Sequence, residues 1–164
     1  MTKFEYQLDI LKIEIETVNA SIRQMDKMGE SIKNWAILTW AAATGATITQ
    51  EKLNPYIALT AVIPLVFWLV DTWYRRIQRK FIWRSIEISK FLNDERLSKS
   101  FVQQKMVDFV LFDPKSRLTK GEKYEQFVGW KRVMMFRSLS LLYLSLAGMS
   151  IFAWIIKLIL DKHA

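Results

Sequence analysis

Three apolar runs interrupt an otherwise polar chain, and their lengths predict its architecture. They are Trp35–Thr49, Pro55–Tyr74 and Ser138–Leu160. About 20 apolar residues in a helix match the hydrocarbon core of a bilayer, so the second and third runs predict transmembrane helices. The first run is shorter, but it has no polar face, and only residues 50–54 separate it from the second. We therefore predict an all-α integral membrane protein with three transmembrane helices, the first two forming a hairpin at 34–74 and the third spanning 138–160.

The N-terminal segment, residues 1–33, carries an apolar stripe that predicts a long amphipathic helix. The stripe advances by alternating fours and threes, the heptad spacing of helices that pack along one another. Its members are Phe4, Leu8, Leu11, Ile15, Val18, Ile22, Met25 and Ile32. Charged residues such as Glu14 and Arg23 are expected on the solvated face. Two interpretations are open: a coiled coil with another copy of the chain, or packing on the protein's own cytoplasmic helices.

No proline interrupts the N-terminal segment, so its helix is expected to run through Asn34 into the first apolar run. Residues 75–137 predict a basic, helical cytoplasmic region. The helix of the second run should continue to about Leu92, and further helices are expected at Leu97–Phe112 and Glu122–Arg137, with a loop at 116–121. No segment has the pattern of a strand.

The charge distribution predicts how the chain is oriented in a membrane. There are 24 Lys and Arg against 16 Asp and Glu, and most of the basic residues lie before the first apolar run or between Arg75 and Arg137. Basic loops stay on the cytoplasmic side. We expect a membrane protein with a cytoplasmic N-terminus and the C-terminus on the opposite side. The excess charge then reflects topology and anionic headgroups, which makes the lipid bilayer the expected partner and nucleic acid an unlikely one.

The residues that most often carry chemistry are scarce. The chain has no cysteine, and its one histidine, His163, is the penultimate residue. This leaves no ordinary zinc site and no serine–histidine triad, and no phosphate-binding glycine loop occurs. We expect no catalytic residues, no metal, no cofactor and no enzymatic activity.

Asp71 is an acidic residue inside the second apolar run, where a buried charge needs a partner. Arg75 follows one helical turn later, at a spacing that lets the two side chains meet. An interfacial Asp71–Arg75 pair that fixes the depth of the helix is the leading interpretation. The alternative is a polar contact inside the helix bundle or lining a pore. Pro64 lies in the middle of the same run and predicts a kink.

Two further groups of residues are candidates for binding and assembly. Arg76, Lys80 and Arg84 repeat every four residues, which predicts a face toward lipid headgroups or solvent, or alternatively a site for an anionic ligand. Small residues at helical spacing favour close helix contact and a homo-oligomer. On the first and third runs these are Ala41 with Gly45, Ala42 with Ala46, and Ser140 with Ala147 beside Gly148.

The run Val66–Phe81 resembles a pattern found in small bacterial membrane proteins. Trp68, Asp71, Tyr74 and Arg75 stand at comparable places, ahead of a charged cytoplasmic helix. With an amphipathic N-terminal helix and a two-span hairpin, the layout of about residues 4–95 is similar to the SLATT-type membrane effectors of antiphage defence. The third apolar run and the helices after Leu97 depart from the simplest two-span form.

That resemblance implies a non-enzymatic, oligomeric effector that disrupts the inner membrane when a cytoplasmic regulatory or sensor protein signals infection. One alternative is a membrane scaffold that recruits a cytoplasmic partner. A second alternative is a regulator that binds an anionic nucleotide through Arg76, Lys80 and Arg84.

Overall fold

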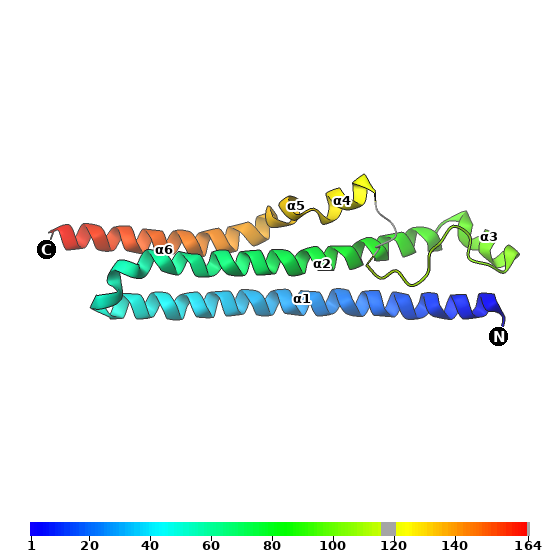
Figure 1. The fold of residues 1–164 in the computed structure, drawn as a ribbon, viewed down its shortest axis with the longest axis horizontal. Helices are drawn as coiled ribbons and strands as arrows, with labels where there is room; N and C mark the ends of the chain where they lie inside the picture. Colours follow the sequence, from blue (N-terminus) through cyan, green and yellow to red (C-terminus); the bar gives the residue numbers. More distant parts are fainter. Residues whose placement is uncertain (116–120, 164) are drawn as a thin grey trace. The chain divides into compact units, whose positions relative to one another are not determined.

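The computed structural model describes residues 1–115 and 121–163, and its regular elements within them are all helical. In chain order they are α1 (Lys3–Thr49), the 3-10 helix η1 (Glu51–Ala61), α2 (Val62–Leu92), α3 (Glu95–Gln103), α4 (Glu122–Val128), α5 (Trp130–Met134) and α6 (Arg137–His163) (Figure 1). The predicted all-α class is confirmed. A loop was predicted at 116–121, and residues 116–120 of it lie outside the described residues.

Helix α1 is one continuous helix of 47 residues, as the absence of proline predicted. Its start is fixed by a capping box, in which side chains satisfy backbone N–H groups that have no partner in the helix. The Thr2 backbone N–H donates to Glu5 Oε2 at 2.6 Å, and the Glu5 N–H donates to Thr2 Oγ1 at 3.2 Å. The helix ends at Thr49, because Gln50 is extended.

The described residues form two compact units. Unit 1 comprises Met1–Lys27 and Arg75–Gly129, and unit 2 comprises Met28–Tyr74 and Trp130–Ala164. Helices α1 and α2 each continue from one unit into the other, as the unbroken ribbons of Figure 1 show. Most of the polar sequence is therefore in unit 1, and all three apolar runs are in unit 2.

The core of unit 1 is built by the apolar stripe of α1. The stripe packs within its own chain against α2 and the segment after α3, which supports the second of the two open interpretations. The buried residues of this core are Phe4, Leu11 and Val18 from the stripe, with Phe81, Ile88, Phe91 and Met106 from the elements packed against it. Because these faces are covered inside the unit, the stripe is not an open coiled-coil surface.

The prediction of a helix at Leu97–Phe112 is wrong after Gln103, where α3 ends. Helix α3 begins at an Asp94 cap, whose side chain accepts the Arg96 N–H at 3.0 Å, and ends where Gln104 turns left-handed with φ 50°. The following residues, 104–115, have no regular structure, and we call them the strap. Asp108 and Phe112 in the strap also have positive φ, at 49° and 60°.

The single helix predicted at Glu122–Arg137 is also divided. It breaks into α4 and α5 at Gly129, where φ is −59° and ψ is 136°. A Cβ atom at Gly129 would lie 2.9 Å from the backbone oxygen of Glu125, closer than side chains ordinarily approach. The break therefore depends on the missing side chain.

In unit 2 the second apolar run does not form one regular α-helix. Its first residues belong to η1, and α2 begins only at Val62. This places Pro64 in the first turn of α2, directly after the 3-10 helix η1. The kink predicted at Pro64 stays a prediction. The continuation of α2 to Leu92 is confirmed.

Two helical stretches, Lys52–Leu92 and Glu122–Leu160, are long and apolar enough to span a membrane. The prediction of three spans is corrected to two candidates. The first run, Trp35–Thr49, is short and rich in Ala, Thr and Gly, and it forms the end of a helix that is otherwise polar. Within unit 2 this run packs instead beside the other two, because buried Ala36 contacts a cluster that includes Leu139 and Tyr143.

Candidate functional site

A buried ion pair between α1 and α2 is the main polar feature of unit 1. Glu14 and Arg84 are 1% and 2% exposed. Arg84 Nε donates to Glu14 Oε1 at 2.8 Å, and Arg84 Nη2 donates to Glu14 Oε2 at 3.1 Å. This two-pronged geometry is the strongest that a guanidinium and a carboxylate can form. We call the pair the Glu14–Arg84 clamp.

The clamp also holds the strap. The backbone N–H groups of Phe112 and Asp113 each donate to the Glu14 carboxylate at 2.8 Å. Arg84 Nη2 in turn donates to the carbonyl oxygen of Val110. A buried charge is tolerated only when its hydrogen-bonding capacity is largely satisfied, and here backbone groups of the strap supply much of it. The clamp and the strap therefore form one structural unit.

Neither clamp residue lies where its sequence pattern predicted. Glu14 was expected on the solvated face of α1, although it follows Leu11 by three residues and precedes Val18 by four. These spacings put it beside the apolar stripe, and that is the signal by which it could have been found. Arg84 was expected on a headgroup-facing or solvated ladder, but it is buried among the partners described above.

The rest of the predicted basic ladder does not share one surface with Arg84. Arg76 Nε donates to the carbonyl oxygen of Val128 at 3.0 Å, at the end of α4. Lys80 is half-buried. Arg79, which was not singled out, donates to the carbonyl oxygen of Phe127 and lies 3.8 Å from the centre of that ring. Arg76 and Arg79 therefore fasten α4 to α2.

A cavity of about 400 Å³ opens beside the clamp in unit 1. Aromatic, basic and acidic side chains line it together. They are Trp83, Arg84, Glu87, Lys90, Arg96, Asp108, Phe109 and Val110. Two of these basic side chains lie close to acidic ones: Arg84 lies 3.5 Å from Glu87, and Arg96 lies 3.3 Å from Asp94.

Asp94 and Tyr124 in unit 1 titrate away from their ordinary values. The pKa of Asp94 is lowered, chiefly by the hydrogen bond from the Arg96 backbone N–H and then by that residue's side chain. Burial raises the pKa of Tyr124 above 10.0, with the Trp83 ring packed edge-on against it at 5.9 Å. The first shift reflects the cap of α3, and the second reflects the packing of α4.

In unit 2, Asp71 lies inside the bundle, which is the alternative that the sequence left open. Asp71 and Tyr143 are both fully buried, and the Tyr143 hydroxyl donates to Asp71 Oδ2 at 3.1 Å. Arg75, in unit 1, donates to Gln78 at 3.2 Å and lies 3.6 Å from Asp26. The acid thus joins α2 to α6 within unit 2, and its predicted pairing with Arg75 stays a prediction.

A second polar network in unit 2 connects the segments of the three apolar runs. Trp40 Nε1 donates to Ser150 Oγ at 2.8 Å, and Thr60 Oγ1 lies 2.9 Å from the same oxygen. Thr44 Oγ1 extends the network to Thr60 at 3.2 Å. In an apolar medium such groups must find partners within the protein. The network therefore fixes how α1, η1 and α6 pack within unit 2.

The predicted helix-packing residues fall into three sets by exposure. Ser140 is half-buried and Ala147 is buried. The five exposed residues are Ala41, Ala42, Gly45, Ala46 and Gly148. A Cβ atom added at Gly45 or Gly148 would meet nothing within 4 Å. The four predicted packing residues of α1 are thus exposed in unit 2, unlike the buried Ala36 of the same helix.

Among the described residues, no group of three or more His, Cys, Asp or Glu side chains is arranged to hold a metal ion. Comparison of the chain with protein-family models, curated proteins and solved structures finds no match. What the two units do must therefore be argued from their own chemistry.

Proposed function

We propose that this chain is a non-enzymatic, oligomeric effector of the bacterial inner membrane, which permeabilises the membrane when a partner or signal triggers it in antiphage defence. The observation that carries the proposal is the outward apolar surface of unit 2. Only 22% and 28% of the residues are buried in the most apolar windows of the two candidate spans. The core helix of a soluble protein would be mostly buried.

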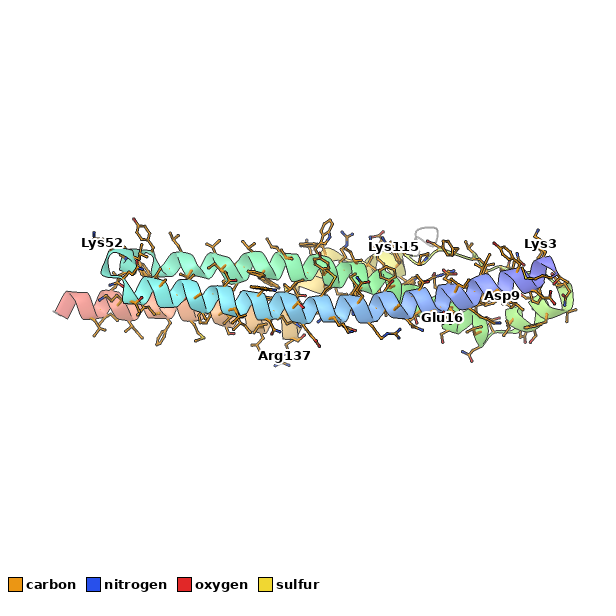
Figure 2. All side chains as sticks on the ribbon, turned by 90° about the horizontal axis from the view of Figure 1, so that it is seen from below. Lys3, Asp9, Glu16, Lys52, Lys115 and Arg137 are labelled. Carbon is orange, nitrogen blue, oxygen red and sulfur yellow. The ribbon has the colours of Figure 1, made fainter. Side chains whose placement is uncertain are left out.

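The size of this surface argues for a lipid environment. Large apolar side chains on α2 and α6 are half or more exposed, including Val66 at 51%, Leu141 at 69% and Phe152 at 65%. Figure 2 shows the outward side chains of this unit, between the labelled Lys52 and Arg137, mostly as carbon. Exposed apolar area costs about 25 cal/mol per Å² in water, and large contiguous patches mark membrane or protein contacts. Embedding in a bilayer removes that cost.

Oligomer formation is supported by the small residues that unit 2 leaves open. Ala41 and Gly45 stand one turn apart on the exposed side of α1, and Gly148 is exposed on α6. Small residues let helices approach closely in lipid, where packing replaces the hydrophobic effect as the driving force. The resemblance of residues 4–95 to SLATT-type effectors points to the same behaviour.

The test is depolarisation of cells that express the chain together with its neighbouring genes during phage challenge. We expect Gly45→Leu and Gly148→Leu to abolish depolarisation while the protein stays in the membrane. Met149→Leu, at an exposed site beside Gly148, is the matched control and should leave it unchanged. Absence of depolarisation and of growth arrest in triggered cells would refute the effector function.

A scaffold that recruits a cytoplasmic partner is the second candidate, and exposed apolar residues in unit 1 favour it. Phe101, Val102 and Phe112 are 49%, 85% and 66% exposed. A scaffold should survive Gly45→Leu and lose partner capture with Val102→Asp, whereas a pore should lose activity with the first change.

A third candidate, a regulator that binds an anionic nucleotide, now rests on the cavity beside the clamp. That cavity joins Lys90 and Arg96 to the aromatic rings of Trp83 and Phe109. Calorimetric titration with nucleotides should detect binding that Lys90→Gln weakens. Binding that is indifferent to this charge would rule the site out.

A further inference from the structure

An apolar cavity of about 310 Å³ lies at one end of unit 2, where α1 ends, η1 begins and the last turns of α6 pass by. Its walls come from all three elements. The apolar lining includes Ile48, Ile57, Ala153 and Ile156, and the polar lining consists of Asn54 and Lys157. The volume falls at the lower end of the range of about 300–1,000 Å³ that ligand sites occupy.

The lining defines the chemistry of the occupant. Aliphatic walls accept a hydrocarbon chain, and Lys157 is the charged group among the described residues that line the cavity. An ammonium group at the edge of an apolar space attracts an anion and presents N–H donors to it. The Asn54 amide supplies further donors beside it. The matching ligand is an amphiphile with an aliphatic chain and an anionic head.

We propose that this cavity binds one acyl chain of an anionic phospholipid, with the phosphate held by Lys157 and Asn54. The proposal rests on the membrane location proposed above. The lipid is favoured over a second copy of the chain because Ile155 and Ile159, on the same stretch of α6, are exposed. A chain in the cavity is then continuous with the surrounding lipid.

The site also lies at the right level for a headgroup. Helix α1 stops at Thr49, and the mostly polar residues 50–54 follow, of which residues 51–54 begin η1. Lys157 is near the end of the third apolar run, where a lysine reaches the interface with its ammonium group. Anionic heads are attracted to such a residue by about 1 kcal/mol per basic group, which corresponds to about a fivefold preference.

The experiment is native mass spectrometry of the full chain, released from detergent that contains equal amounts of phosphatidylglycerol and phosphatidylcholine with identical acyl chains. We expect phosphatidylglycerol to be retained about fivefold more than phosphatidylcholine. Lys157→Gln should bring the ratio close to one, and Lys157→Arg should preserve it. Lys52→Gln is the matched control, because Lys52 is an exposed lysine of η1 that does not line the cavity.

Filling the cavity provides an independent variant. Ala153→Trp should lower the retention of both lipids, and oligomeric mass should stay unchanged. Equal retention of the two lipids by the unaltered chain would overturn the proposal, as would a Lys52→Gln effect as large as that of Lys157→Gln. Loss of oligomer in place of lipid with Ala153→Trp would assign the cavity to a second copy and overturn it too.

Extraction of cell membranes with alkaline carbonate separates this inference from the proposed function. A chain that stays in the membrane but shows no lipid preference refutes the lipid site alone. A chain that is released by carbonate refutes both the membrane location and the lipid site.

Discussion

Removing Glu14 tests whether one buried carboxylate holds unit 1 together. Glu14→Ala leaves the Arg84 guanidinium buried without its main counter-charge, and it removes the acceptor of the Phe112 and Asp113 N–H groups. Breaking a buried pair by removing one partner costs about 3–5 kcal/mol. Since about 1.4 kcal/mol is a factor of ten, amide exchange in the strap should accelerate by on the order of 10² to 10³.

The assay is hydrogen exchange of the full chain in detergent, read by mass spectrometry on peptides that cover the strap. Glu16→Ala is the control, because Glu16 is exposed on the same helix and is labelled in Figure 2. If Glu14→Ala accelerates amide exchange in the strap no more than Glu16→Ala does, the Glu14 carboxylate does not hold the strap.

An apolar replacement of both clamp residues separates charge from backbone contacts. The double change Glu14→Leu and Arg84→Met removes both buried charges, and such replacements are often neutral or stabilising. Protection of α1 and α2 in unit 1 should therefore recover. The strap amides should still exchange fast, because nothing replaces the carboxylate that accepted them.

Three further predictions concern single contacts. Tyr143→Phe removes the hydroxyl that donates to Asp71, and it should destabilise unit 2 by about 1 kcal/mol. Unfolding in mixed detergent measures this loss, and an unchanged unfolding midpoint would contradict the contact. The lowered pKa of Asp94 means that its capping of α3 is present above pH 3.8 and is lost as the pH falls through the lowered value; NMR titration should place its midpoint below 3.8, and Asp94→Asn should remove this dependence. Gly129→Ala puts a Cβ atom 2.9 Å from a backbone oxygen of α4, so circular dichroism should show a lower melting temperature, and an unchanged one would argue against the close approach.

Periodicity predicted the long elements well. The stripe from Phe4 to Ile22 gave α1 its amphipathic face, and the absence of proline correctly predicted one helix through Asn34. The predictions of shorter elements were wrong where contacts with distant parts of the chain outweighed the local helical spacing. The apolar residues after Leu97 have helical spacing, but the strap gains backbone bonds to Glu14 and packing of Met106 in the core, and these favour an irregular path.

The candidate sites were predicted less well, for a related reason. Asp71 and Arg75 have ideal helical spacing, yet the hydroxyl of Tyr143, 72 residues away in sequence, reaches the acid. Glu14 and Arg84 are 70 residues apart. Local spacing cannot predict partners that are so far apart in sequence. An acid beside an apolar stripe and a base on a neighbouring helix should nevertheless be considered as a candidate buried pair.

The central claim is that unit 2 lies in a bilayer with unit 1 on the cytoplasmic side. Because the chain has no cysteine, single cysteines can be introduced at Ser98, exposed in α3, and at Phe152, exposed in α6, and probed with a membrane-impermeant maleimide. We predict that the cysteine at 98 reacts in inverted vesicles and not in intact spheroplasts, and that the cysteine at 152 reacts in neither until detergent is added. Reaction of the cysteine at 152 without detergent would contradict the account.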